Sequence, residues 1–114
     1  MSSVFSQCLF EAAYAAAAET TLYTAASGTR VKVDKYTVYN SSAGVLTYTV
    51  KFVASGGAAA ATNVLGVASI QPGETYTLPW AVGHDLNPGD FISALCGTAS
   101  ALVHRITGRV TTTS

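Results

Sequence analysis

The two histidines, His84 and His104, have the side-chain type best suited to acid-base chemistry near neutral pH. Nucleophilic catalysis would also need a serine or cysteine beside a base that a third group orients. The sequence has no nucleophile-elbow serine, no phosphate-binding glycine-lysine loop and no histidine pair with zinc spacing. His104 shares its parity with Leu102 and Ile106, which indicates a hydrogen-bonded core histidine. We therefore predict a protein that is not an enzyme, with no catalytic residues and no cofactor.

One set of side chains could ligate a metal: His84, Asp85 and Asp90, with Glu74 as a more distant addition. Calcium takes six to eight oxygen ligands, which is more than one short turn supplies. Asp90 directly follows a proline-glycine pair, and aspartate in that position commonly accepts hydrogen bonds from turn amides. We interpret the set as turn chemistry and predict no metal site.

Trp80 lies where a strand ends at Pro79, with Tyr76 before it and His84 after it. An exposed tryptophan beside polar groups could stack on a sugar ring. It could also anchor a protein interface, where tryptophan is enriched. A third interpretation is that Trp80 closes one end of the hydrophobic core. The sequence leaves these three roles open.

The composition favours a protein whose surface is covered by other subunits. The chain has 114 residues, 49% of them hydrophobic and only 11% charged, against roughly 25% charged residues in ordinary soluble domains. Six basic and six acidic residues cancel. We therefore predict no nucleic-acid partner and interpret the basic residues as solvated strand positions or interface contacts. They include Arg30, Lys32, Lys35, Arg105 and Arg109.

Cys8 and Cys96 do not form a closely spaced redox pair, and small secreted scaffolds usually have more cysteines. We predict that both are reduced and buried, in a protein made in the cytoplasm. The apolar run from Ala12 to Ala18 has no basic residue before it and is only seven residues long. It therefore matches neither a signal peptide nor a membrane span, and we expect no membrane association.

From Thr20 onward, short segments rich in β-forming residues alternate with turn signals, which is typical of an all-β fold. We predict an antiparallel β-sandwich with a jelly-roll-like topology and seven or eight strands. A hairpin turn is expected at Ser41–Gly44, and further turns at Gln71–Glu74 and Asn87–Asp90. The predicted strands cover residues 20–25, 30–40, 46–53, 63–70, 75–78, 91–96 and 101–111.

The strand at 30–40 changes its alternation midway. Val31 and Val33 set one parity, and Tyr36 and Val38 set the other. A one-residue slip moves side chains to the opposite face unless an extra residue is inserted. We therefore predict a β-bulge or a sheet-to-sheet bend at Asp34-Lys35.

The opening segment has a different pattern from the rest. Large apolar residues lie among alanines without a period of two, and the segment fits a short helix, a strand or an extended arm. We divide the chain into an N-terminal arm at 1–19 and a single β-sandwich domain at 20–114, and we expect the arm to serve assembly. The residues that we predict at interfaces are Phe5, Leu9, Phe10, Tyr14, Trp80, Arg105 and Arg109.

Six pieces of sequence form an ordered series along the chain: TTLYTA (20–25), VDKYTVYNSS (33–42), VASGG (53–57), SIQPGETYTLP (69–79), LNPGDFISALC (86–96) and ITGRV (106–110). Taken in this order, they resemble small β-sandwich virion structural proteins of tailed bacteriophages and prophages. The resemblance covers nearly the whole chain after Thr20 and includes the alanine-rich opening. Trp80 departs from it, because a polar residue is expected there in relatives.

The resemblance implies a capsid decoration (cement) protein or a neck or tail component, located in the virion and made in the host cytoplasm. We expect a homo-oligomer, a trimer first and a dimer next, bound to the major capsid protein or to other virion subunits. Many modest interfaces on a repeating lattice would give stable occupancy. The alternative is a neck, tail or fibre-associated module that binds host surface carbohydrate or a receptor.

Overall fold

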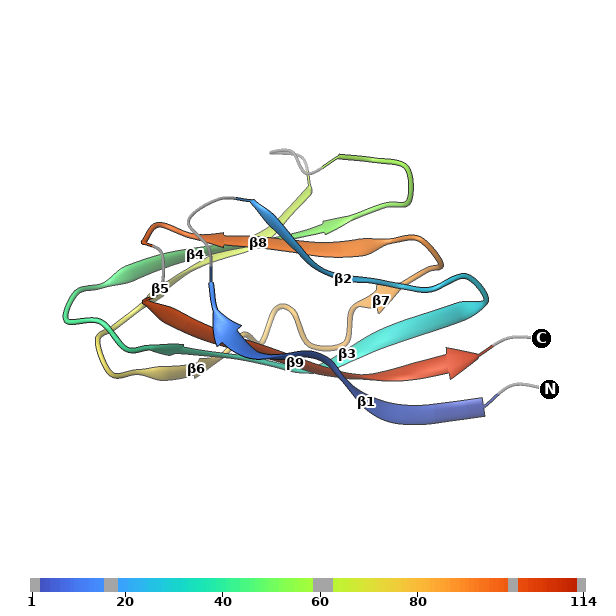
Figure 1. Cartoon of the computed structure of the whole chain (residues 1–114), viewed down its shortest axis with the longest axis horizontal. Coiled ribbons are helices and arrows are strands. Elements are labelled where there is room, and N and C mark those ends of the chain that lie inside the picture. The colour runs from blue at the N-terminus through green and yellow to red at the C-terminus, as the bar shows by residue number, and fades with distance from the viewer. Residues whose placement is uncertain (1–2, 16–18, 59–62, 99–100, 113–114) are drawn as a thin grey trace.

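The computed structural model describes residues 3–15, 19–58, 63–98 and 101–112, and their side chains except those of residues 3, 5 and 11–14. Nine strands form within these residues, and they stack as two antiparallel sheets (Figure 1). The strands are β1 (Ser3–Tyr14), β2 (Thr20–Thr24), β3 (Thr29–Asn40), β4 (Leu46–Val53), β5 (Val64–Ile70), β6 (Thr75–Thr77), β7 (Asp85–Leu86), β8 (Phe91–Cys96) and β9 (Leu102–Thr112).

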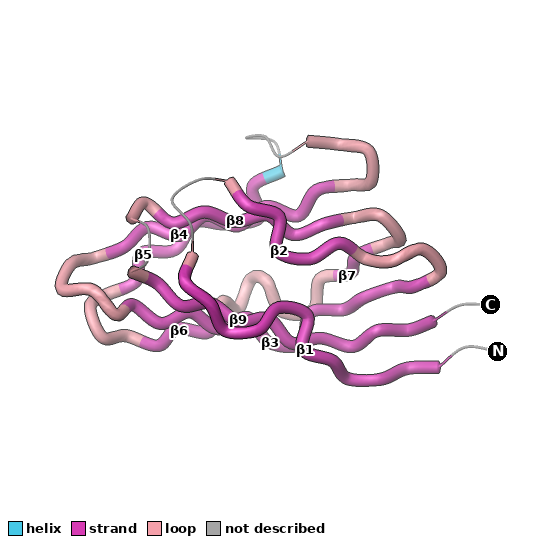
Figure 2. The backbone as a smooth tube through the Cα atoms, viewed as in Figure 1, coloured by secondary structure: helices cyan, strands magenta, loops and turns pink. Residues whose placement is uncertain are grey.

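The strand order is that of a jelly roll. Sheet A has the order β1-β9-β3-β6, with β7 also paired to β3, and sheet B has the order β2-β8-β4-β5. With β6 and β7 counted as one interrupted strand, consecutive strands pass mostly from one sheet to the other. The described loops that pass between the sheets, from β2 to β3, β3 to β4, β5 to β6 and β7 to β8, lie at the ends of the sandwich (Figure 2). The predicted fold class is confirmed.

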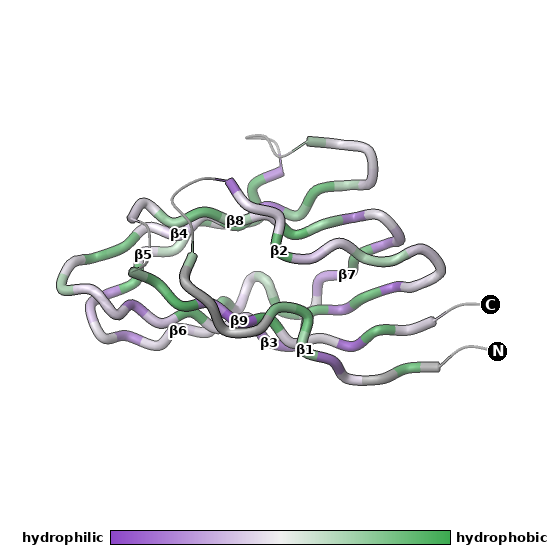
Figure 3. Tube along the Cα trace, viewed as in Figure 1, coloured by the Kyte–Doolittle hydropathy of each residue, from purple (hydrophilic) through white to green (hydrophobic). Residues whose placement is uncertain are grey.

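The core lies between the sheets and is built from alternate residues of each strand. On β9, Leu102, Ile106 and Val110 are buried, whereas Arg105 and Arg109 are exposed, as predicted. The hydrophobic residues of the two sheets recur along the strands in Figure 3. This period of two follows from strand geometry, because successive side chains point to opposite faces.

The predicted bulge is confirmed. Val33 pairs with Gly108 and Lys35 pairs with Thr107, so that Asp34 is the extra residue on β3. The inserted residue restores the parity of the buried positions, and Val33 and Tyr36 are both fully buried. A Cβ atom at Gly108 would lie closer to the Lys32 carbonyl oxygen than real Cβ atoms come. Glycine is therefore required opposite the bulge.

The predicted hairpin at Ser41–Gly44 is wrong. Its two flanking strands, β3 and β4, belong to different sheets and do not pair. Asn40 builds this crossing from a buried position: its Nδ2 donates to the carbonyl oxygens of Gly44 (2.7 Å) and Ile70 (2.9 Å). Its Oδ1 accepts from the Ser42 amide (2.8 Å). The turn residues signalled a reversal of the chain, and they carry no information on which strands pair.

The opening segment is a strand. β1 pairs antiparallel with β9 from Ser3↔Thr112 to Tyr14↔Val103, with register shifts between Cys8 and Phe10 and between Phe10 and Ala13. Pairing with β9 outweighs the helix propensity of the alanines, which is a weak preference that tertiary contacts override. The bulges explain why no period of two is visible in its sequence.

Candidate interaction surfaces

The outer face of sheet A gathers most of the positive charge of the molecule. Five of the six basic side chains lie on the two neighbouring strands β3 and β9. The register places Lys32 beside Arg109 and Arg105 beside Thr37. The five residues, which we call the cationic face, are Arg30, Lys32, Lys35, Arg105 and Arg109.

Two carboxylates compensate part of this charge. Asp34, the bulge residue, accepts from Nε of Arg109 (3.1 Å to both oxygens) and lies 3.0 Å from its NH2 group. Asp85 lies 3.4 Å from the Lys32 ammonium. A shallow hollow of about 230 Å³ adjoins this second pair, between Arg30 and Thr111. It is smaller than the pockets that hold drug-sized ligands, which begin near 300 Å³.

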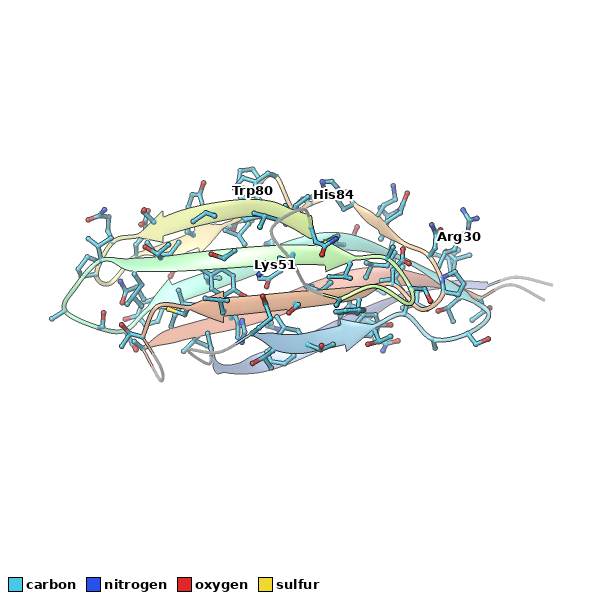
Figure 4. The ribbon with its side chains drawn as sticks, turned by 90° about the horizontal axis from the view of Figure 1, so that it is seen from above. Arg30, Lys51, Trp80 and His84 are labelled. Atoms are coloured by element: carbon cyan, nitrogen blue, oxygen red, sulfur yellow. The ribbon has the colours of Figure 1, made fainter. Side chains whose placement is uncertain are left out.

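The outer face of sheet B has almost no charge. Thr47, Val67 and Ser69 are exposed there, and Leu95 is half-buried. The face has one charged network, at its β2 side, made by Lys51 and Glu19 with Ser93. Figure 4 shows Lys51 over sheet B and Arg30 at one end of the sandwich.

Among the described residues, this network comes nearest in side-chain types to catalytic machinery, and no sequence motif indicates it. Lys51 pairs directly with Glu19, and Ser93 Oγ donates to Glu19 Oε2 (2.8 Å). Burial acts to raise the pKa of Glu19, but the hydrogen bonds from Lys51 and Ser93 outweigh it and lower the pKa. A carboxylate with a lowered pKa is a weak base, so the serine is not activated. The register pairing of Lys51 with Ser93 across β4 and β8 brings the group together.

A buried polar chain joins the two sheets. The hydroxyl groups of Tyr36 (β3) and Tyr48 (β4) share a hydrogen bond, and Tyr48 also bonds His104 Nδ1 on β9 (2.6 Å). The ring of Phe10 packs edge-on against His104, 4.7 Å between centroids. Burial lowers the pKa of His104 to about 4 and raises the pKa of both tyrosines. The interpretation of His104 as a hydrogen-bonded core histidine is confirmed.

Trp80 lies on one flank of the sandwich, in the segment between β6 and β7, and is half-buried against the core. Its ring lies directly over Gly66 of β5, where a Cβ atom would clash with it. His84 follows on the same flank, and its ring packs on Phe52 at 5.5 Å (Figure 4). Trp80 therefore contributes to closing the gap between the sheets, while part of the side chain stays accessible.

The other predicted interface residues have unequal exposure. Arg105 and Arg109 are exposed, whereas Leu9 is buried in the core and Phe10 is half-buried against it. The side chains of Phe5 and Tyr14 lie outside the described residues. Cys96 is buried and Cys8 half-buried, both as free thiols, so the prediction of burial holds for Cys96 and not fully for Cys8.

Two of the acidic residues that could have ligated a metal, Asp90 and Glu74, accept hydrogen bonds in turns, and the third, Asp85, lies on β7 and pairs with Lys32. Asp90 accepts from the amides of Asn87 (2.9 Å) and Ser55 (3.0 Å), and Glu74 accepts from the amide of Gln71 (2.8 Å). The turn interpretation of Asp90 is confirmed. In the described ranges, no three His, Cys, Asp or Glu side chains are grouped so that they could hold a metal ion. The same ranges contain no helix of the length and apolarity needed to cross a membrane.

No known protein family and no curated protein sequence matches the chain. Solved structures share its fold. A chain of the disulfide-linked pili that form Bacillus endospore appendages has a TM-score of 0.58 and 16% identity. The match covers 99% of this chain and 90% of that one. A chain of the infectious bursal disease virus Gx strain has a TM-score of 0.52 and 11% identity, over 98% of this chain and 33% of that one. At these identities the likeness shows a shared β-sandwich fold.

Proposed function

We propose that this chain is a non-enzymatic structural subunit of a bacteriophage virion, and specifically a capsid decoration (cement) protein that stabilises the shell by multivalent binding. The observation that carries the proposal is the segregation of charge. The outer face of sheet A presents five basic side chains, and the outer face of sheet B presents one, Lys51. A face of this kind suits docking on an acidic surface of the major capsid protein. The fold shared with a pilus subunit and a viral chain supports a structural role.

Each ion pair between the cationic face and an acidic surface would be weak by itself. Exposed ion pairs contribute up to about 1 kcal/mol each and are screened by salt. Many copies on a repeating lattice turn such contacts into stable occupancy, above all when the copies themselves associate. We propose that the protein acts as a homo-oligomer, a trimer first and a dimer next. Within the cationic face, Arg105 and Arg109 are the proposed contacts.

The alternative is a neck, tail or fibre-associated module that binds host carbohydrate through Trp80. Gly66 occupies one side of the Trp80 ring, so only its remaining exposed part could stack on a sugar. The cationic face has no role in that function. We therefore favour the decoration role.

The test measures binding to purified expanded shells that lack the protein. Bound protein should raise the melting temperature of the shells, and binding should weaken as salt rises. Arg105→Gln should weaken binding several-fold at low salt, because each oligomer loses one contact per copy. Thr47→Glu is the matched control, since it makes the same change of one charge unit on the exposed face of sheet B.

Equal binding by the two variants would contradict a docking role for the cationic face. Binding to host cells or to surface polysaccharide, with shell melting unchanged, would support the carbohydrate alternative instead.

A further inference from the structure

The four sheet edges of this sandwich are not equally protected against pairing with another strand. An edge strand presents unpaired backbone N–H and C=O groups, which natural proteins protect by shortness, bulges, charge or proline. Opposite β1, sheet A ends in β6 and β7, with three and two residues. β1 itself has two register shifts. In sheet B, β2 has five residues and a register shift between Thr21 and Tyr23.

The fourth edge, β5, lacks most of these protections. Its seven residues, VLGVASI, include no charged residue and no proline. In the described part of the chain it pairs only with β4. One register shift lies near its start, between Val50 and Lys51 of the partner strand, and the stretch from Gly66 to Ile70 is regular. The Ile70 carbonyl oxygen accepts from Asn40, so the part of this stretch from Gly66 to Ser69 offers a regular, uncharged backbone edge.

Exposed apolar side chains gather at the same edge. Two of the six large apolar side chains that are exposed in the described residues lie on β5 itself, Val64 and Val67, and a third, Val82, lies in the segment that joins β6 to β7. Val67 is 56% exposed. Val82 belongs to the segment between Trp80, which packs on Gly66, and His84, which packs on Phe52. A strand added beside β5 would pair with its backbone and would cover valines and part of Trp80.

We propose that β5 is a self-association edge, at which two copies of this chain pair their β5 strands antiparallel about a twofold axis and join their B sheets. A twofold interface brings a surface against itself, so it must be self-complementary. β5 meets this condition, because no like charges lie opposite each other in any antiparallel register of the strand with itself. The cationic face would not pair with itself, since its charges repel.

This inference rests on the self-association part of the proposed function and selects the dimer. It does not depend on the shell, because the oligomeric state is measured on the purified protein alone. Failure of shell binding would refute the decoration role and leave the β5 dimer standing. Conversely, a purified protein that does not dimerise through β5 would refute this inference, and shell binding by the cationic face would still be tested separately.

The experiment uses charge at Val67. Val67 is the central residue of β5, so it lies opposite the partner's Val67 when the two strands pair along their full length. Val67→Lys and Val67→Glu then each place like charges opposite each other across the twofold axis, which destabilises strand pairing. We expect the wild-type chain to be dimeric at tens of micromolar in light scattering, and each variant to be monomeric with unchanged circular dichroism. Mixing the two variants should restore dimers, because lysine then meets glutamate. Thr47→Lys, on the same sheet face but one strand inward, should stay dimeric.

Three results would overturn the proposal. The first is a monomeric wild type, which would leave β5 available for a strand of another protein. The second is an oligomer whose size the Val67 variants do not change. The third is a mixture of Lys and Glu variants that stays monomeric.

Discussion

The outer faces of sheets A and B differ in charge, although the chain as a whole is neutral. Sheet A carries five basic side chains with Asp34 and Asp85 beside them, whereas sheet B carries one network around Lys51. The cause is strand periodicity, because the outward positions of β3 and β9 fall side by side on one surface. The neutral net charge of the chain therefore does not reveal that its basic side chains are concentrated on one face, which would suit that face to an acidic partner.

The edge strands of the two sheets also differ, but here sheet B has the feature suited to association: its edge strand β5 is the less protected against pairing with another strand. Sheet A ends in a bulged strand on one side and two very short strands on the other. Sheet B ends in the short β2 on one side and, on the other, in β5, whose pairing with β4 is regular from Gly66 to Ile70. Charge would thus direct docking on a different molecule, and the uncharged edge would direct pairing between copies. On these two proposals the sheets would divide the roles between them, and the following predictions test that division.

Deleting Asp34 should have the largest effect on stability, because this residue keeps the buried side chains before and after the bulge on the same face of sheet A. Without the bulge residue, either Val31 and Val33 or Tyr36 and Val38 would turn outward. We expect insoluble or unfolded protein on expression. Gly108→Ala should also destabilise strongly through its clash with the Lys32 carbonyl. Normal thermal melting of the deletion variant would show that the strand accommodates the phase change in another way.

Truncation to Glu19 tests the division into an arm at 1–19 and a domain at 20–114. From the sequence we expected a folded chain that no longer assembles. In the structure β1 pairs along β9, and Leu9 and Ala15 are buried. We now expect a loss of several kcal/mol in the free energy of unfolding, from lost apolar burial at about 25 cal/mol per Å². Urea denaturation measures it, and unchanged stability with lost assembly would support the arm.

Acid should weaken the link between the sheets through His104. Its pKa is about 4 when folded and near 6.5 when unfolded, so the unfolded chain binds more protons in that window. The contribution of neutral His104 to the free energy of unfolding is therefore fully present above about pH 6.5. It is lost as the pH falls towards 4, and the loss amounts to roughly 3 kcal/mol. Urea midpoints at pH 7 and pH 4 should show it, and His104→Gln should depend less on pH. Equal acid dependence of both proteins would exclude His104 as the cause.

Trp80→Ala should open the flank beside β5 and cost about 2 kcal/mol, since a half-buried tryptophan loses less than a fully buried one. Gly66→Ala should push the ring away and weaken the same contact. Thermal melting measures both effects. A fully stable Trp80→Ala variant would leave this side chain free for a partner or a sugar.

Arg109→Ala should have the smallest effect on stability, below about 1 kcal/mol, because its ion pair with Asp34 is exposed and screened. Thermal melting should change little between low and high salt. A large loss of stability would mean that the pair holds the bulge in place, and that the cationic face has a structural role in sheet A.

Local patterns predicted much of this structure. The turn at Asn87–Asp90, the parity change at Asp34 and the buried position of His104 could all be read from neighbouring residues. Each depends on strand alternation or on turn chemistry within a few positions, which the order of residues contains directly.

The all-β class, most strand positions, the bulge and the lack of familiar catalytic motifs could all be predicted from the order of residues alone. Tertiary structure decided which strands pair, and with that the crossing at Asn40, the place of β1 on β9 and the network of Glu19 with Lys51 and Ser93. The physical reason is that strand pairing joins residues far apart in the chain. Alternation specifies the face to which a side chain points, and only the packed sheets specify its neighbours.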